Sequence, residues 1–163
     1  MTIRIERLMA LLFAAALGAG ILPETASAES NAAAAVISAC LKKVESEQAS
    51  PQKCIGIVAD ACLQRASSTQ DLIACYAGET EEWDSRLNRA YKFVMGRLPA
   101  DAANKLREAQ RSWLDTRKLT CGFYGVFYDG GTIAGPSAAS CYNGETAERA
   151  LYLKFFADEL AKR

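Results

Sequence analysis

The sequence predicts an all-α fold, a disulfide-stapled helical bundle of about five helices with one long glycine-rich loop before the last helix. Apolar residues recur at helical spacing along most of the chain, and no strand-like alternation is longer than a few residues. Six cysteines lie after residue 28, which adds cross-links to the bundle. Half of the residues are hydrophobic and 23% are charged, as is typical of a globular protein.

The first 28 residues have the features of a signal peptide. Arg4 and Arg7 precede an apolar run over residues 8–22, and Ala26-Ser27-Ala28 fits a signal-peptidase site. The run is shorter than the ~20 residues that span a bilayer, so we expect no stable membrane anchor after cleavage. The protein is therefore predicted to be periplasmic or secreted.

The remainder, residues 29–163, is predicted to be a single helical domain. It comprises a helical hairpin extension over residues 29–68 and a core over residues 69–163. In the extension, helices are expected over residues 31–48 and 53–64, separated at Ser50-Pro51.

The core begins with a capping signal. Ser68 and Asp71 have the spacing of a capping box for a long third helix that Pro99 ends. A fourth helix is expected from Ala102 to about Phe123. Turn-forming residues then predict a loop from about Gly125 to Gly144, in which Asn143 would cap the final helix.

The even number of cysteines in an exported chain predicts three disulfides. If the first three helices fold back on one another, facing positions favour Cys40–Cys62 and Cys54–Cys75, and Cys121–Cys141 remains. The alternative set joins Cys40 to Cys54 and Cys62 to Cys75. Sequence alone does not decide between the two sets.

Charge and residue usage exclude several function classes. Nineteen basic residues balance nineteen acidic ones, which leaves no electrostatic footprint for nucleic acid. The absence of histidine excludes Ser-His-Asp and Cys-His catalysis, and the chain has no Cys-x-x-Cys pair for a zinc knuckle. We therefore expect no metal, no cofactor and no nucleic-acid partner.

Polar side chains lie among apolar ones on the third and fourth helices. If these helices fold back at Pro99, Asp84 faces Arg117 and Asn88 faces Gln110. We interpret both as structural polar pairs that fix helix register.

The alternative is an active site built on Asp84, with Glu79, Glu82 or Glu108 as the second carboxylate. Glycoside hydrolysis needs two carboxyl groups about 5–9.5 Å apart. Carboxylates are common in any helix, and the chain has no histidine to act as a base near neutral pH. We therefore predict that the protein is not an enzyme.

A set of ordered motif residues spans the third to the fifth helix. They are Trp83-Asp84, Leu87-Asn88, Tyr91, Leu98-Pro99, Leu106-Arg107, Ala109-Gln110-Arg111, Trp113, Arg117, Cys121, Gly130-Gly131-Thr132, Cys141, Thr146 and Arg149. In this pattern the chain resembles the LprI-like lysozyme-inhibitor family of the bacterial cell envelope. The resemblance covers about residues 75–160.

The resemblance implies a helical envelope protein that binds another protein, with lysozyme or a related muramidase as the expected partner. A non-inhibitory structural or adaptor protein of the envelope is the alternative. The member that named the family is a lipoprotein, whereas this chain has no cysteine near the predicted cleavage site.

The predicted binding element is the tethered loop over residues 122–140, because aromatic side chains dominate binding hot spots. Its candidate binding residues are Phe123, Tyr124, Phe127, Tyr128, Asp129, Gly130 and Gly131. The alternative is that the four rings pack down as a lid over the helices.

Overall fold

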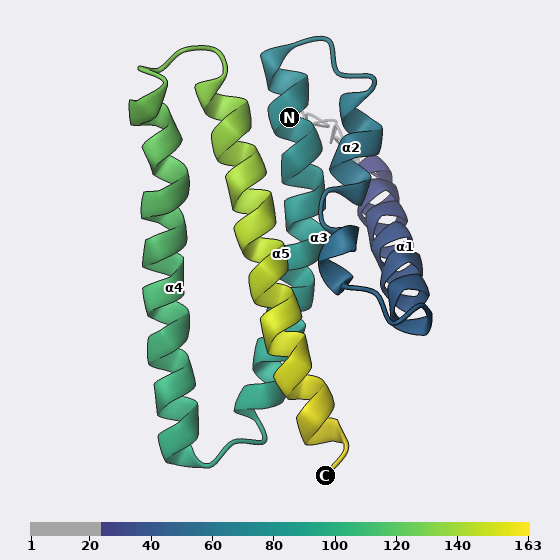
Figure 1. Ribbon diagram of the computed structural model, residues 1–163, viewed down its shortest axis with the longest axis vertical. Helices are drawn as coiled ribbons and strands as arrows, with labels where there is room; N and C mark the ends of the chain where they lie inside the picture. Colours follow the sequence, from purple (N-terminus) through teal and green to yellow (C-terminus); the bar gives the residue numbers. More distant parts are fainter. Residues whose placement is uncertain (1–23) are drawn as a thin grey trace, which may run out of the picture.

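The computed structural model describes residues 24–163, and this part of the chain contains helices and no strand, which confirms the predicted all-α class (Figure 1). The elements are α1 (Glu24–Ser46), the 3₁₀ helix η1 (Pro51–Cys54), α2 (Ile57–Leu63), α3 (Thr69–Met95), α4 (Ala100–Phe127) and α5 (Ala134–Ala161). Most of the predicted signal peptide, residues 1–28, lies outside the described residues. Its cleavage stays a prediction.

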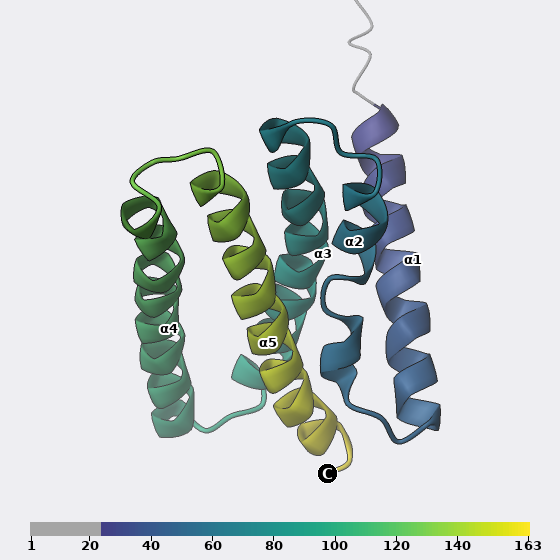
Figure 2. The same cartoon turned by 45° about the horizontal axis from the view of Figure 1, so that its top comes forward.

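The helices lie across the molecule in the order α4, α5, α3, α2 and α1 (Figure 2). The most extensive packing joins α3 to α5, and α4 packs on the other side of α5. On the far side of α3, α1 and α2 pack against that helix and against each other. The last helix in the sequence therefore lies in the middle of the bundle, between α3 and α4.

This central position of α5 follows from its residues, because a helix that is apolar or small on several sides tends to be buried. Its buried residues are Ala134, Pro136, Asn143, Thr146, Ala147, Ala150, Leu151 and Leu153. By contrast, α4 buries only Ala103 and Cys121. The main core joins Trp83 and Leu87 of α3 to four residues of α5, Ala147, Ala150, Leu151 and Leu153, and to Ile37, Val44 and Cys54.

The predicted glycine-rich loop over residues 125–144 is wrong. Helix α4 extends to Phe127 and α5 begins at Ala134, so the connection is a short turn. The small residues after Ala134 permit close packing, because a Cβ atom on Gly135 would lie 2.9 Å from Cδ1 of Ile73 in α3. Gly135, which suggests a turn in the sequence, thus lies in a helix–helix contact.

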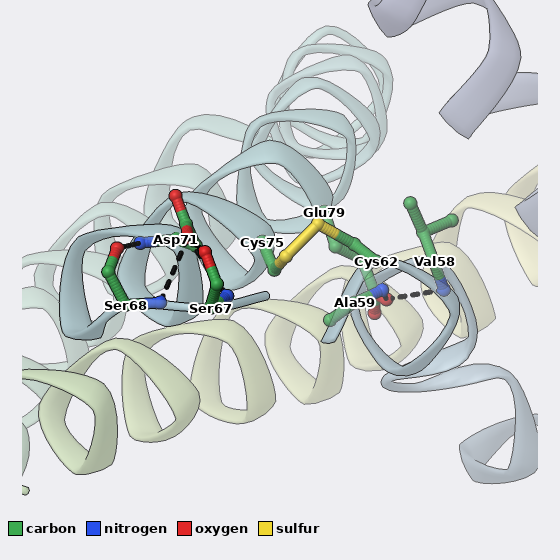
Figure 3. The surroundings of a disulfide bond; sticks show 8 residues. All are labelled: Val58, Ala59, Cys62, Ser67, Ser68, Asp71, Cys75 and Glu79. Carbon is green, nitrogen blue, oxygen red and sulfur yellow. Dashed lines mark hydrogen bonds between the residues drawn. A yellow bond between two sulfur atoms is a disulfide. The ribbon is translucent and has the colours of Figure 1, made fainter. Parts of the chain in front are cut away.

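A buried carboxylate of α3 caps the short helix α2. Glu79 has no exposed surface. The backbone N–H of Gly56 donates to its Oε1 at 2.6 Å, and those of Val58 and Ala59 donate to its Oε2 at 2.8 Å each. Figure 3 shows Glu79 against the first turn of α2. The carboxylate supplies the acceptor that the α2 N-terminus lacks locally.

The same carboxylate also connects α3 to α5. The indole N–H of Trp83 donates to Oε1 of Glu79 at 2.8 Å, and the side-chain amide of Asn143 donates to it at 3.1 Å. Asn143 is buried within α5, so its predicted role as the cap of the last helix is wrong. Five donors thus converge on one carboxyl group where three helices meet.

The disulfides follow the alternative set, and the favoured Cys40–Cys62 and Cys54–Cys75 pairs are wrong. The bonds are Cys40–Cys54, Cys62–Cys75 and Cys121–Cys141. The predicted second helix does not begin at residue 53, because η1 forms a separate turn that brings Cys54 to α1. Cys62, at the end of α2, then lies beside Cys75 near the start of α3 (Figure 3).

The predicted capping box at the start of α3 is confirmed. Ser68 Oγ accepts from the backbone N–H of Asp71 at 3.1 Å, and the Asp71 carboxylate accepts from the backbone N–H of Ser68 at 2.9 Å. The backbone N–H of Ser67 also donates to Asp71, at 3.0 Å. This backbone hydrogen bond is the main reason why the pKa of Asp71 lies below its ordinary value.

The lowered pKa of Asp71 predicts a pH-dependent contribution to stability. The carboxylate stabilises the folded state above the unfolded-state pKa of about 4, and this contribution disappears as the pH falls through the lower folded-state pKa. We expect Asp71→Asn to lower the melting temperature at pH 7, with a smaller difference from wild type at pH 2. Asp115→Asn, on the exposed surface of α4, is the control and should leave both values unchanged. An equal loss for Asp71→Asn at both pH values would contradict the assignment.

Candidate binding surface

The outer face of α4 changes character along its length. Over the first turns it carries polar side chains such as Lys105, Glu108 and Asp115, all exposed. Over the last three turns it carries large apolar side chains, next to the exposed Lys118 and Thr120. Four residues at helical spacing form what we call the distal patch, and their exposed fractions are high: Leu119 (74%), Phe123 (58%), Val126 (77%) and Phe127 (65%). Contiguous exposed apolar side chains of this kind mark interaction sites.

Ring contacts organise the end of the distal patch. Phe123 and Phe127 lie one turn apart with ring centroids 5.9 Å from each other. Phe127 meets Tyr128 edge to face at 5.0 Å. Ile133, at the start of the final helix, is also exposed beside the turn. The rings therefore stay on the surface and support one another there, rather than packing down as a lid over the helices.

The turn after α4 is a compact helix C-cap. The N–H of Gly130 donates to the carbonyl of Gly125, and that of Asp129 donates to Val126, both at about 3 Å. This is the Schellman pattern, with Asp129 in the left-handed region at φ 49° and Gly130 at φ 67°. Asp129, Gly130 and Gly131 thus serve to end α4 and turn the chain.

Tyr124 lies on a different face from the distal patch. Its ring stacks near Tyr128, with centroids 6.2 Å apart, and it lines a groove of about 430 Å³. The other walls come from α2, α3 and the start of α5, including Leu72, Tyr76 and Pro136. Of the four predicted aromatic binding residues, Phe123, Phe127 and Tyr128 therefore share the outer surface, and Tyr124 does not.

Leu119, Val126 and Ile133 are not among the predicted binding residues. Residues 119, 123 and 126 lie at helical spacing, but this spacing indicates one exposed face only if α4 continues to Phe127. The loop predicted from Gly125 ends the expected helix before Val126. Cys121, buried behind the patch, joins this end of α4 to Cys141 of α5.

A second cluster lies along the interface between α4 and α5, where aromatic rings and guanidinium groups alternate. The guanidinium of Arg117 lies 4.6 Å from the ring centroid of Trp113 and 5.6 Å from that of Tyr142. The guanidinium of Arg149 lies 5.6 Å from Trp113 and 4.9 Å from Tyr152. We call these five side chains the arginine ladder.

Hydrogen bonds hold both guanidinium groups of the arginine ladder in place. Arg117 Nη1 donates to the hydroxyl of Thr146 at 2.7 Å, and Arg149 Nε donates to Oε1 of Gln110 at 2.9 Å. Burial lowers the pKa of Arg149 from its ordinary value, although arginine stays protonated in proteins. Motif residues from two distant segments thus meet in one cluster.

The predicted polar pairs Asp84–Arg117 and Asn88–Gln110 are wrong. Asn88 Nδ2 donates to Asp84 within α3 at 2.8 Å, while Arg117 and Gln110 contact residues of α5. The reason is the central position of α5, which separates the faces of α3 and α4 that were expected to meet.

The carboxylates proposed to assist Asp84 have other surroundings. Glu79 is buried and capped by five donors, and Glu82 is buried in an ion pair with Nε of Arg86 at 2.7 Å. Glu108 lies on the exposed face of α4, away from α3. In the part of the chain that is described, no group of His, Cys, Asp and Glu side chains could hold a metal ion.

Comparison with known proteins identifies the family. The sequence model of the family described as "Lysozyme inhibitor LprI" matches residues 59–153, more than half of the chain. The chain belongs to the LprI family. No curated protein and no solved structure gives a significant match. The predicted resemblance over about residues 75–160 is therefore confirmed, and the LprI match begins earlier, within α2.

Membership of the LprI family, together with three disulfides, indicates a protein outside the cytoplasm. Among the described helices, none combines the length and the apolar character that a membrane span requires. At the level of the family, the function is that of an inhibitor domain rather than of an enzyme.

Proposed function

We propose that this protein is a periplasmic or secreted inhibitor that binds lysozyme or a related muramidase through the distal patch. The observation that carries the proposal is the coincidence of an LprI-family chain with a contiguous apolar surface on one disulfide-anchored helix end. The patch lies near the α4–α5 turn, at the same end of the bundle as the connection between α2 and α3 (Figure 1).

The physical case for binding is that the patch is both apolar and rigid. Burial of the exposed Phe and Val side chains against a partner would favour binding by about 25 cal/mol per Å² of apolar surface removed from water. The Schellman turn and the Cys121–Cys141 disulfide hold the helix end in shape before binding, which reduces the entropic cost of association.

Charge contributes little to long-range attraction in this proposal. The chain has a formal net charge of zero, so it lacks the acidic field that would steer it toward a basic lysozyme. The distal patch then contributes to affinity through shape and apolar contact rather than through long-range charge. We therefore expect the rate of association with the partner to depend only weakly on ionic strength.

The proposal predicts that removing one ring of the distal patch weakens inhibition. In a lysozyme lysis assay with the purified, oxidised protein, Phe127→Ala should raise the concentration for half-inhibition about tenfold or more, as loss of a hot-spot aromatic does. Because Phe127 is 65% exposed, its removal should leave the melting temperature nearly unchanged. Phe123→Ala should act in the same direction.

The matched control is Phe155→Ala. The exposed fraction of Phe155, 60%, is similar to that of Phe127. Phe155 lies toward the C-terminal end of α5, however, far from the α4–α5 turn (Figure 1). Its removal should change inhibition less than twofold. Equal losses for the two variants would contradict the assignment to the distal patch. If the wild-type protein inhibits none of several lysozyme types at micromolar excess, the alternative of an envelope adaptor is favoured.

A further inference from the structure

The arginine ladder holds two positive charges that no carboxylate of the described chain neutralises. None of the ion pairs among residues 31–163 includes Arg117 or Arg149. Both side chains are partly buried between α4 and α5. Buried charges in proteins are normally paired, since leaving water without a counter-charge is costly.

Another arginine at a helix interface, Arg86, is paired with a carboxylate. Arg86 lies between α1 and α3, and its Nε is 2.7 Å from the buried carboxylate of Glu82, although the N–H is not aligned as a hydrogen bond. Its Nη2 donates to the carbonyl of Ala34 and to the hydroxyl of Ser38. This protein therefore pairs one interfacial arginine with an acid and leaves the two of the ladder without one.

Each ladder guanidinium keeps donors for a ligand. Nε of Arg117 and Nη2 of Arg149 are buried and have no acceptor in the protein. Nη2 of Arg117 and Nη1 of Arg149 also make no protein hydrogen bond, yet they are not among the buried atoms. One accessible nitrogen on each group is thus free, while the rest of the group is held rigid by stacking and hydrogen bonds.

The two guanidinium groups of the ladder lie near the same indole ring, that of Trp113. Arg117 follows Trp113 by one helical turn, whereas Gln110, the acceptor for Arg149, precedes it by about one turn. Distances of 4.6 and 5.6 Å to the same centroid place the guanidinium carbons no more than about 10 Å apart.

We propose that the arginine ladder is a recognition site for carboxylate groups on the surface of the protein partner. Arginine guanidinium forms strong, charge-assisted hydrogen bonds with carboxylate, and a rigid, partly desolvated guanidinium gains more from them than a flexible exposed one. The carboxyl pair of a glycosidase cleft is about 5–9.5 Å apart, which is below the upper limit of about 10 Å on the separation of the two guanidinium carbons. This proposal depends on the proposed function only for the identity of the partner, lysozyme or a related muramidase.

Trp113 is part of the arginine ladder, so its fluorescence can report the binding of a ligand there. The chain has two tryptophans, and the other, Trp83, is buried in the core. At low salt, we expect a tetraglutamate peptide to change the tryptophan fluorescence saturably, while a tetraglutamine peptide does not. Arg117→Gln and Arg149→Gln should each weaken peptide binding about tenfold or more. Arg111→Gln, which removes an exposed charge from the same helix, should change it less than twofold.

Three results would overturn the proposal: equal binding of the two peptides, equal weakening by Arg111→Gln, or no saturable change with the glutamate peptide. Inorganic phosphate forms a separate arm, and binding as tight as that of the peptide would show a site for small anions rather than for a protein carboxylate. The comparison of the two peptides uses wild-type protein, so it stands even if an arginine variant does not fold. A wild-type protein that binds tetraglutamate but inhibits no lysozyme would retain the site and reject the proposed function.

Discussion

Replacing Glu79 by glutamine should lower the free energy of unfolding by about 3–5 kcal/mol, measured by urea denaturation at pH 7. Both carboxyl oxygens accept hydrogen bonds, three on Oε1 and two on Oε2. A glutamine amide has only one oxygen, so its NH₂ group would face at least two donors in a fully buried place. The short helix α2 would lose its N-terminal cap at the same time.

The matched control is Glu81→Gln, two residues further along α3 and exposed. It removes the same charge from the same helix and should change the unfolding free energy by less than about 0.5 kcal/mol. If Glu79→Gln costs less than 1 kcal/mol, the carboxylate is not the junction of the three helices. If the variant cannot be purified, Asn143→Ala removes one donor and should give a smaller loss with the same sign.

The double variant Cys121→Ser/Cys141→Ser should detach the end of α4 and weaken inhibition together. Loss of a 20-residue closure costs about 3 kcal/mol in the chain-entropy model. Because α4 buries little besides Ala103 and Cys121, this loss should appear locally. Hydrogen exchange should accelerate across residues 119–128 while α3 stays protected.

Cys62→Ser/Cys75→Ser provides the comparison. That bond closes 13 residues, so the entropic loss is again about 3 kcal/mol, but it lies at the junction of α2 and α3. If the distal patch binds the partner, this variant should inhibit nearly as well as wild type under conditions where it is folded. Unchanged exchange over residues 119–128 in the Cys121/Cys141 variant would show that α4 does not depend on the disulfide.

The sequence predicted the helices well where their end signals are local. Ser68 and Asp71 form the capping box that their spacing predicts, and Pro99 lies between α3 and α4. These signals depend on residues within one turn of each other, so no tertiary information is needed. Phe123 and Phe127, two of the predicted binding residues, are exposed on α4.

The predicted polar pairs and the predicted loop were wrong because both depend on the packing of α5, which no local sequence pattern shows. Asp84 and Arg117 face each other only if α3 packs on α4, and α5 occupies that place instead. Gly135 is typical of a loop in the sequence, but in the structure it allows the close approach of Ile73. The arginine ladder joins α4 to α5 across about 30 residues, and no local pattern encodes such a contact.

The position of α5 also bears on how the protein is made. In a chain that is exported N-terminus first, α5 is the last helix to emerge. Helices α3 and α4 would therefore emerge before α5, the helix against which both of them pack. The disulfides suit this order, because each joins one cysteine to the next along the chain. An oxidase acting on thiols as they emerge would form the native bonds in sequence without an isomerase, and Cys121–Cys141 would close only when α5 has arrived.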